Sequence, residues 1–366
     1  MKIIVIANGN AELKATWSGV PNRVVTEFRA LGHEVVCYDI SCVWWIKPIR
    51  IIFNRVVRKI WRHWRWIPFE VTRMGVWMMS KWARNLVNSI ESVDLVVVFS
   101  FCIDSKGFVP PTVLVHDWTN GYMQQMFHGR AMTQSEIKGD ANQFAAMKSA
   151  QKVVVLYPAS AEYIRNNVGE NVFFYCNPVN AAPPIDLARN VDSGVVSKHI
   201  LVIGGETYLE NVRCVVSAAE KLGYNDLVID VVGASLEQHG RRNVKIVSHG
   251  YLIKDNPEQC KKYYELIRDA RCLVNIRTGW GGGSSIAEAL YYGLPVIVGR
   301  YPDIIALYGQ DESFGFFCEP GNVNELASKL KLMFSLNEAA YRRMCLCAAE
   351  KTCADTYTRF VQQILQ

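Results

Sequence analysis

The chain has 366 residues, of which 50% are hydrophobic and 20% charged, with a formal net charge of +6. This length exceeds one ordinary hydrophobic core, so it favours two domains. The 11 cysteines are scattered and form no C-x-x-C pair, which indicates buried thiols in a reducing cytosol rather than a disulfide framework. No run of about 18 apolar residues is present, which argues against a transmembrane helix.

Residues 1–40 are typical of an opening βαβ unit. We expect a strand from Lys2 to Ala7, a helix from Asn22 to Leu31 and a second strand from Glu34 to Tyr38. The polar loop after the first strand contains Gly19. A glycine loop here is common in open α/β sheets, so alone it is weak evidence for a ligand.

Residues 44–84 contain seven of the ten tryptophans and ten basic residues, with Glu70 as the only acid. Apolar residues recur at helical spacing from Ile49 to Trp64, and the opposite face is basic. A helix of this kind suits an anionic membrane surface. The residues expected to face the membrane are Arg55, Arg58, Lys59, Trp61, Arg62, Trp64 and Arg65.

Two other interpretations of this segment remain open. The apolar face of the helix would pack on its own domain in the first. In the second, the basic and aromatic residues would bind single-stranded nucleic acid.

The runs from Asp94 to Phe99 and from Thr112 to Val115 are predicted to be buried strands. The second run leads into His116 and Asp117. Side chains at the carboxyl ends of parallel strands lie where open α/β sheets bind ligands. His116 and Asp117 are therefore candidate site residues, although a histidine at a strand end is often purely structural.

The rest of the first half continues the alternation of helices and strands. We expect a helix over 133–150, a strand from Val153 to Tyr157, a helix from Ser160 to Asn167 and a strand from Val172 to Tyr175. These elements complete a first domain over residues 1–180. Residues 181–197 contain Pro183, Pro184 and Gly194 and are predicted to be a linker.

Residues 198–350 are predicted to form a second α/β domain. Its first strand, His199 to Ile203, is followed by Gly204 and Gly205. A later strand, Val244 to Val247, leads to Gly250 and Tyr251. Residues 351–366 are predicted to form a helix that packs back on the first domain.

The segment from Asn275 to Gly299 is the most informative part of the sequence. A short apolar strand precedes Arg277, and the glycine run Gly281, Gly282 and Gly283 follows. Ser284 and Ser285 are good N-cap residues for the next helix. A glycine loop that leads into a helix N-terminus attracts phosphate, and Arg277 would add a charge-assisted contact. Glu288, one turn inside the helix, is placed to accept hydrogen bonds from the ribose hydroxyls. A glycine-rich connection with no ligand is the alternative.

This segment resembles the donor-binding pattern of retaining GT-B glycosyltransferases, family 4 in particular, which runs E-G-F-G-x-x-x-x-E-A-x-x-x-G-x-P-V. The matching residues are Gly281, Gly283, Glu288, Ala289, Gly293, Pro295 and Val296. Arg277 and the serine pair are closer to a rhamnosyltransferase-like variant. Trp280 replaces the first glutamate, and Gly205 and Glu210 stand where the family has an arginine and a lysine for the diphosphate.

The resemblance implies roles for several of these residues. Glu288 would bind the nucleotide ribose, and Gly250 and Tyr251 would cradle the base. Gly19 would face the donor or the acceptor, and His116 would contact the donor sugar. It also implies a GT-B fold, with two Rossmann-like domains of parallel sheets and the site in an interdomain cleft.

The resemblance further implies an enzyme that moves a sugar to a glycan or lipid-linked acceptor, of the cell-surface polysaccharide or lipopolysaccharide type. The donor would be a UDP-sugar, or else a GDP- or dTDP-sugar, and no metal or further cofactor is expected. The expected location is the cytoplasmic face of a membrane, bound peripherally, with no nucleic-acid partner. A GT-B nucleotide-sugar epimerase and a non-catalytic membrane-bound scaffold are the alternatives.

Overall fold

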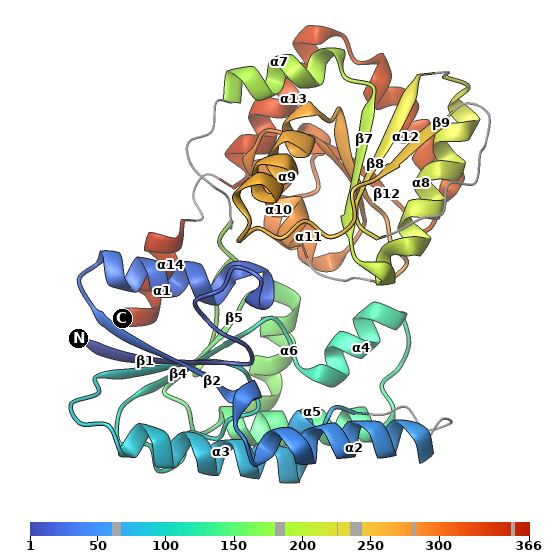
Figure 1. The fold of residues 1–366 in the computed structure, drawn as a ribbon. Helices are drawn as coiled ribbons and strands as arrows, with labels where there is room; N and C mark the ends of the chain where they lie inside the picture. The colour runs from blue at the N-terminus through green and yellow to red at the C-terminus, as the bar shows by residue number, and fades with distance from the viewer. Residues whose placement is uncertain (61–66, 180–186, 225, 235–243, 280–282, 353–355) are drawn as a thin grey trace. The chain divides into compact units, whose positions relative to one another are not determined.

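The computed structural model describes the whole chain except residues 61–66, 180–186, 225, 235–243, 280–282 and 353–355. The chain divides into two compact units (Figure 1). The first comprises Met1–Pro178 together with Thr356–Gln366, and the second comprises Val179–Asp355.

The sheet of the first unit has the strand order β2-β1-β3-β4-β5-β6, and its strands pair in parallel. Valine and isoleucine dominate these strands because both faces of a parallel sheet are buried. The strands are β1 (Lys2–Ala7), β2 (Glu34–Asp39), β3 (Leu95–Phe99), β4 (Thr112–His116), β5 (Lys152–Val155) and β6 (Val172–Phe174).

Helices cover both faces of this sheet: α1 and α14 lie on one face, and α2, α3 and α5 lie on the other (Figure 1). Their bounds are α1 (Val20–Ala30), α2 (Ile46–Ile60), α3 (Arg73–Asn88), α4 (Asn120–His128), α5 (Gln134–Met147), α6 (Pro158–Val168) and α14 (Tyr357–Leu365). The C-terminal helix is tied to the sheet by Lys152, whose Nζ donates a 2.9 Å hydrogen bond to the carbonyl of Gln363.

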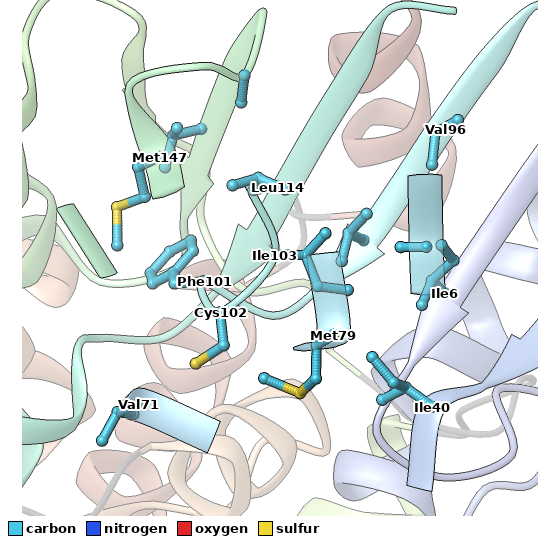
Figure 2. Packing of buried hydrophobic residues seen from close by; sticks show 14 of the residues in the cluster. Ile6, Ile40, Val71, Met79, Val96, Phe101, Cys102, Ile103, Leu114 and Met147 are labelled. Atoms are coloured by element: carbon cyan, nitrogen blue, oxygen red, sulfur yellow. The ribbon is translucent and has the colours of Figure 1, made fainter. Parts of the chain in front are cut away.

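The core of the first unit forms where the strands meet α3 and α5. Figure 2 shows Ile6, Val96 and Leu114 of the sheet together with Met79 of α3 and Met147 of α5. The side chains of Ile6, Val96, Leu114 and Met147 have no exposed surface, and Met79 is buried. This packing fixes the strands whose carboxyl ends carry the candidate residues.

The sheet of the second unit has the order β12-β11-β10-β7-β8-β9, and its strands also pair in parallel. The two parallel sheets confirm the prediction of two Rossmann-like domains. The strands are β7 (His199–Gly204), β8 (Leu227–Gly233), β9 (Val244–Ser248), β10 (Cys272–Asn275), β11 (Val296–Gly299) and β12 (Gly315–Cys318).

Helix α8 packs against α12 beside this sheet, and α7 packs against α9 and α13. The helices are α7 (Leu187–Val196), α8 (Leu209–Leu222), α9 (Pro257–Asp269), α10 (Ser284–Tyr291), α11 (Pro302–Tyr308), α12 (Val323–Ser335) and α13 (Glu338–Glu350).

The prediction of a linker over residues 181–197 was wrong for its second half, which forms α7. Leu187, Val191 and Val195 recur at helical spacing and join the core of the second unit. The prolines that suggested a linker precede the helix, and residues 180–186 lie outside the described part of the chain.

Candidate functional site

The strand order of the second unit reverses between β7 and β10, and open α/β sheets bind ligands outside the carboxyl ends of the strands at such a point. Gly204 ends β7, and Arg277 follows the end of β10 by two residues. Asn211 on α8 fixes this edge. Its Nδ2 donates to the carbonyl of Val274 at 3.1 Å, and its Oδ1 accepts from the backbone N–H of Ile276 at 2.8 Å.

Arg277 is buried and contacts two tyrosines. Its guanidinium carbon is 5.1 Å from the ring centroid of Tyr208, which precedes α8. The hydroxyl of Tyr301, after β11, donates to the backbone carbonyl of Arg277. Burial raises the pKa of Tyr208, and the charge and hydrogen bond of Arg277 oppose this rise. The structure thus places the arginine at the switch point, with Tyr208 near its side chain and Tyr301 on its backbone.

Two strand-end glycines make room for these tyrosines. A Cβ at Gly204 would fall 2.7 Å from the Cβ of Tyr208, and a Cβ at Gly299 would fall 2.7 Å from the hydroxyl of Tyr301. Real side-chain atoms do not come this close. Glycine is therefore required at both positions because a tyrosine side chain packs against the backbone, and not because of a turn.

An acid lies beside Arg277 at this edge. The hydroxyl of Thr278 is 3.2 and 3.0 Å from the two carboxylate oxygens of Glu210. Glu210 and Gly205 occupy the positions where the family pattern has cations. The carboxyl edge of the second sheet therefore has the carboxylate of Glu210 where a lysine was expected. Arg277 is a cation close to this carboxylate, next to Thr278, whose hydroxyl contacts Glu210.

Helix α10 begins six residues after Thr278. Ser284 and Ser285 are its first two residues, so the prediction that they cap it was wrong. The cap is Gly283, which has no side chain to accept a hydrogen bond. Gly281 and Gly282 lie outside the described residues, as does Trp280.

Glu288 of α10 is buried, with only 2% of its surface exposed, and each carboxylate oxygen has a donor. Lys254 Nζ lies 2.5 Å from Oε1, and the hydroxyl of Tyr263 donates to Oε2. Tyr263 belongs to α9, and Lys254 lies in the loop between β9 and α9. Neither was predicted, because a lone lysine in a loop gives no signal in the sequence.

Gly250 and Tyr251 lie in the same loop as Lys254. Gly250 has φ of 63°, a left-handed conformation that favours glycine, and its carbonyl accepts a 2.8 Å hydrogen bond from the N–H of Gly233. Tyr251 is 69% exposed. The loop is thus anchored at the end of β8 and presents an aromatic ring to solvent.

The strand order of the first unit reverses between β1 and β3, and the residues after β1 meet the end of β4. The ring of Trp17 stacks on His116, with centroids 5.0 Å apart. Its Nε1 donates a 3.0 Å hydrogen bond to Oδ2 of Asp117. Trp17, Ser18 and Gly19 are consecutive left-handed residues, with φ of 44°, 54° and 82°. The structure thus brings the Gly19 loop to His116 and Asp117.

Burial changes the protonation of both predicted residues. It lowers the pKa of His116 to about 4, against the effect of a hydrogen bond with the Trp118 backbone. It raises the pKa of Asp117 to about 7, and the hydrogen bond from Trp17 opposes this rise. His116 is therefore neutral at pH 7, and Asp117 gains or loses a proton near that pH.

The residues predicted to face a membrane are only partly described. Arg55 is exposed on α2. Arg58 and Lys59 belong to the same helix, but their side chains lie outside the described part of the structure. Trp61, Arg62, Trp64 and Arg65 are outside it altogether.

The described residues offer neither a metal cluster nor a membrane-spanning helix. They contain no group of three or more His, Cys, Asp and Glu side chains that could hold a metal ion. Among them, no helix combines the length and the apolar character needed to cross a bilayer.

Residues 195–351, most of the second unit, match the family model "Glycosyl transferases group 1". No curated protein matches the sequence. Similar solved structures include sucrose-phosphate synthase from Thermosynechococcus elongatus, with a TM-score of 0.68 and 13% identity over 100% of this chain and 98% of the other. An α,α-trehalose-phosphate synthase (UDP-forming) from Burkholderia vietnamiensis has a TM-score of 0.67 and 10% identity, covering 100% and 99%.

A third similar structure is a variant of S. aureus TarM in complex with fondaparinux, α-GlcNAc-glycerol and UDP. Its TM-score is 0.56 at 15% identity, over 79% of this chain, and the match spans 57% of the length of TarM. Together these likenesses show that the chain has the GT-B fold of glycosyltransferases.

Proposed function

We propose that this GT-B protein, whose second unit matches the group 1 glycosyltransferase family, moves a sugar from a nucleotide diphosphate donor to an acceptor hydroxyl. The observation that carries the proposal is the position of Arg277. It lies at the switch point of a doubly wound sheet, seven residues before α10, with Tyr208 near its guanidinium and the Tyr301 hydroxyl on its backbone carbonyl. A cation beside a helix N-terminus stabilises a departing diphosphate.

We propose UDP as the nucleotide of the donor, with GDP and dTDP as the alternatives to be tested. UDP is present with the TarM variant and is the product named for the trehalose-phosphate synthase. We further propose that the reaction retains the anomeric configuration and needs no metal ion. The resemblance of the Arg277–Glu288 segment to retaining family 4 enzymes supports the first point. Charge stabilisation by Arg277 and backbone amides supports the second.

We propose that His116 donates or accepts a hydrogen bond with the donor sugar. Its lowered pKa keeps the imidazole neutral at pH 7, so it can do either. Asp117, held by the indole of Trp17, would stabilise positive charge at the sugar when ionised. Both side chains lie at a carboxyl edge of the first sheet, where such folds bind substrates.

The test is to incubate the protein with UDP-, GDP- and dTDP-sugars and measure both its thermal stability and the release of nucleotide diphosphate. One nucleotide should stabilise the protein, and its diphosphate should be released slowly. Arg277→Ala should reduce that release about 100-fold or more, and Arg277→Lys should reduce it less. Arg342→Ala is the matched control, because Arg342 is a partly exposed arginine of α13 paired with Asp192 and Glu338.

Two results would contradict the proposal. Full activity in Arg277→Ala would exclude Arg277 as the diphosphate ligand. Failure of every nucleotide to bind would favour a non-catalytic scaffold, which the acid at position 210 would then explain.

We also propose that the first unit binds the anionic cytoplasmic face of a membrane, where a glycan or lipid-linked acceptor would be presented. Helix α2 packs inward through Ile46 and Phe53, yet Ile49, Ile52 and Val56 are exposed along one stripe. Internal packing therefore accounts for only part of its apolar face.

Helix α3 supports the same proposal with a second exposed face. It carries Arg73, Met74, Trp77 and Lys81 at helical spacing, and all four are exposed. Lys81 Nζ lies 5.3 Å from the Trp77 ring centroid. Exposed tryptophan beside lysine and arginine suits the headgroup region of an anionic bilayer.

The membrane proposal is tested by co-sedimentation with vesicles of phosphatidylcholine, with and without phosphatidylglycerol. The protein should bind only the anionic vesicles, and high salt should release it. The double variant Ile52→Ser/Trp77→Ser should bind about 10-fold more weakly, since the two side chains contribute most through burial in lipid. Leu346→Ser, at an exposed leucine of α13, is the control. Undiminished binding by the double variant would exclude this surface.

A further inference from the structure

Lys254 forms an ion pair with Glu288, the residue that the family pattern assigns to the nucleotide ribose. We infer that Lys254 is a second phosphate-binding cation of the donor site, in addition to Arg277, and that Glu288 holds its ammonium in place. This inference rests on the proposed function, because it names a further residue for the same nucleotide diphosphate.

The ammonium of Lys254 has a defined position. It lies 2.5 Å from Oε1 of Glu288 and 4.2 Å from the ring centroid of Tyr263, and the centroid of Tyr264 is 5.7 Å away. A carboxylate and two aromatic faces restrict the ammonium to one place. The side chain retains 17% exposure, whereas that of Glu288 retains 3%. The lysine is thus the part of the pair that a ligand can reach.

The position lies beside the start of α10. Glu288 is four residues beyond Ser284, the first residue of the helix, which corresponds to about 6 Å along the axis. The loop of Lys254 leaves the carboxyl end of β9, at the same edge of the sheet as the ends of β7 and β10. A diphosphate at the start of α10 would therefore lie within reach of a lysine side chain.

Charge balance gives an independent reason for a second cation. A nucleoside diphosphate carries at least two negative charges, and Glu210, which contacts Thr278, adds another at this edge. Gly205 contributes no charge. With Arg277 as the only cation the site would be strongly negative, and the positive charge of Lys254 reduces this excess, part of which comes from its partner Glu288. Lysine suits this role because its ammonium binds phosphate as a compact point charge.

A purely structural role for Lys254 makes a different prediction. If the lysine only neutralised buried Glu288, its loss would weaken every ligand that contacts the ribose, with or without phosphate. If it binds phosphate, its loss would weaken only ligands that carry phosphate. Comparing a nucleoside with its diphosphate separates the two roles.

The experiment measures the binding of uridine and of UDP by calorimetry, with competition titrations for the weaker ligand. If the wild-type protein prefers another base, the matching nucleoside and diphosphate are used. The variants are Lys254→Gln, Lys254→Arg and the control Lys261→Gln, whose lysine is an exposed residue of α9 near Glu265. Unfolding by urea establishes that each variant is folded.

We expect Lys254→Gln to weaken UDP binding about 10- to 100-fold and to change uridine binding less than 3-fold, which a phosphate contact requires. Lys254→Arg should retain most of the UDP affinity, and Lys261→Gln should match the wild type. Equal losses for UDP and uridine, or no loss for either, would overturn the inference while leaving the donor site in place. A wild-type protein that binds no nucleoside diphosphate would overturn the donor site and this inference together.

Discussion

The indole Nε1 of Trp17 donates a 3.0 Å hydrogen bond to the carboxylate of Asp117, 100 positions along the chain. The same ring stacks on His116, and its own backbone is left-handed. A non-glycine residue adopts this conformation at an energetic cost, which the surrounding contacts must offset. The loop after β1 and the end of β4 therefore form one structural unit.

Replacement of Trp17 by Phe should retain the stacked ring and remove the N–H donor. The carboxyl pKa of Asp117 should then rise above about 7, because the lost hydrogen bond had lowered it. The free energy of unfolding should fall by about 1 kcal/mol. Carboxyl titration by NMR and urea unfolding measure the two effects, and Trp44→Phe is the control because Trp44 is exposed. An unchanged titration would exclude the hydrogen bond in solution.

Asp117 and His116 should affect the pH dependence of stability in opposite directions. The folded pKa of Asp117, about 7, lies above its ordinary 3.8, so in this interval the native state holds more protons and stability falls as pH rises. The folded pKa of His116, about 4, lies below its ordinary 6.5, so there the unfolded chain holds more protons and stability rises with pH.

Asp117→Asn should therefore make the free energy of unfolding rise more steeply between pH 4 and pH 7 than in the wild type. Between pH 4 and pH 7 the unfolding free energy of the variant should change by at most about 4 kcal/mol more than that of the wild type, the equivalent of about three pKa units. His116→Gln should have the opposite effect. Urea unfolding at several pH values measures both, and curves parallel to that of the wild type would contradict the assignment.

Gly204→Ala should destabilise the second unit by about 1–3 kcal/mol, because the added methyl group would collide with the Tyr208 side chain. Gly205→Ala is a close control. A Cβ there meets no atom within 4 Å, and the φ of −72° suits alanine. Its unfolding free energy should lie within about 0.5 kcal/mol of the wild type. Equal effects of the two substitutions would show that Tyr208 does not occupy this position in solution.

Asp230 of β8 is buried and joins two histidines. Its oxygens lie 2.6 Å from Nδ1 of His199 and 2.7 Å from Nε2 of His249. Asp230→Ala should cost about 1–3 kcal/mol, because both ring nitrogens lose their partner. The control is Asp226→Ala, which removes an exposed aspartate 3.9 Å from Lys198. This substitution should lower the free energy of unfolding by less than about 0.5 kcal/mol. Urea unfolding compares the two.

The strands were predictable because a parallel strand buried on both faces is a continuous β-branched run. Helices α3, α4, α9 and α11 were not predicted, and α7 was taken for a linker because prolines precede it. Tertiary packing of an apolar face supplies most of the stability of such helices.

Spacing pointed to the glycine run and Glu288 as candidate site residues, and the position after a strand pointed to Arg277; their roles stay predictions. The N-cap of α10 was assigned to the serines, whereas it is Gly283, one position earlier. The exact cap residue depends on backbone angles that residue type alone does not determine. Lys254 and Tyr263 were missed because each is distant in sequence from Glu288.

The sequence by itself determined the alternation of strands and helices, the two α/β domains and the strand ends that carry His116 and Arg277. These follow from local periodicity and from the rule that parallel strands end at one edge. Only the tertiary structure decided which groups surround them: Trp17 against Asp117, Tyr208 against Arg277, Lys254 against Glu288. Pairing, burial and pKa depend on contacts between residues far apart in the chain, and no local pattern encodes those contacts.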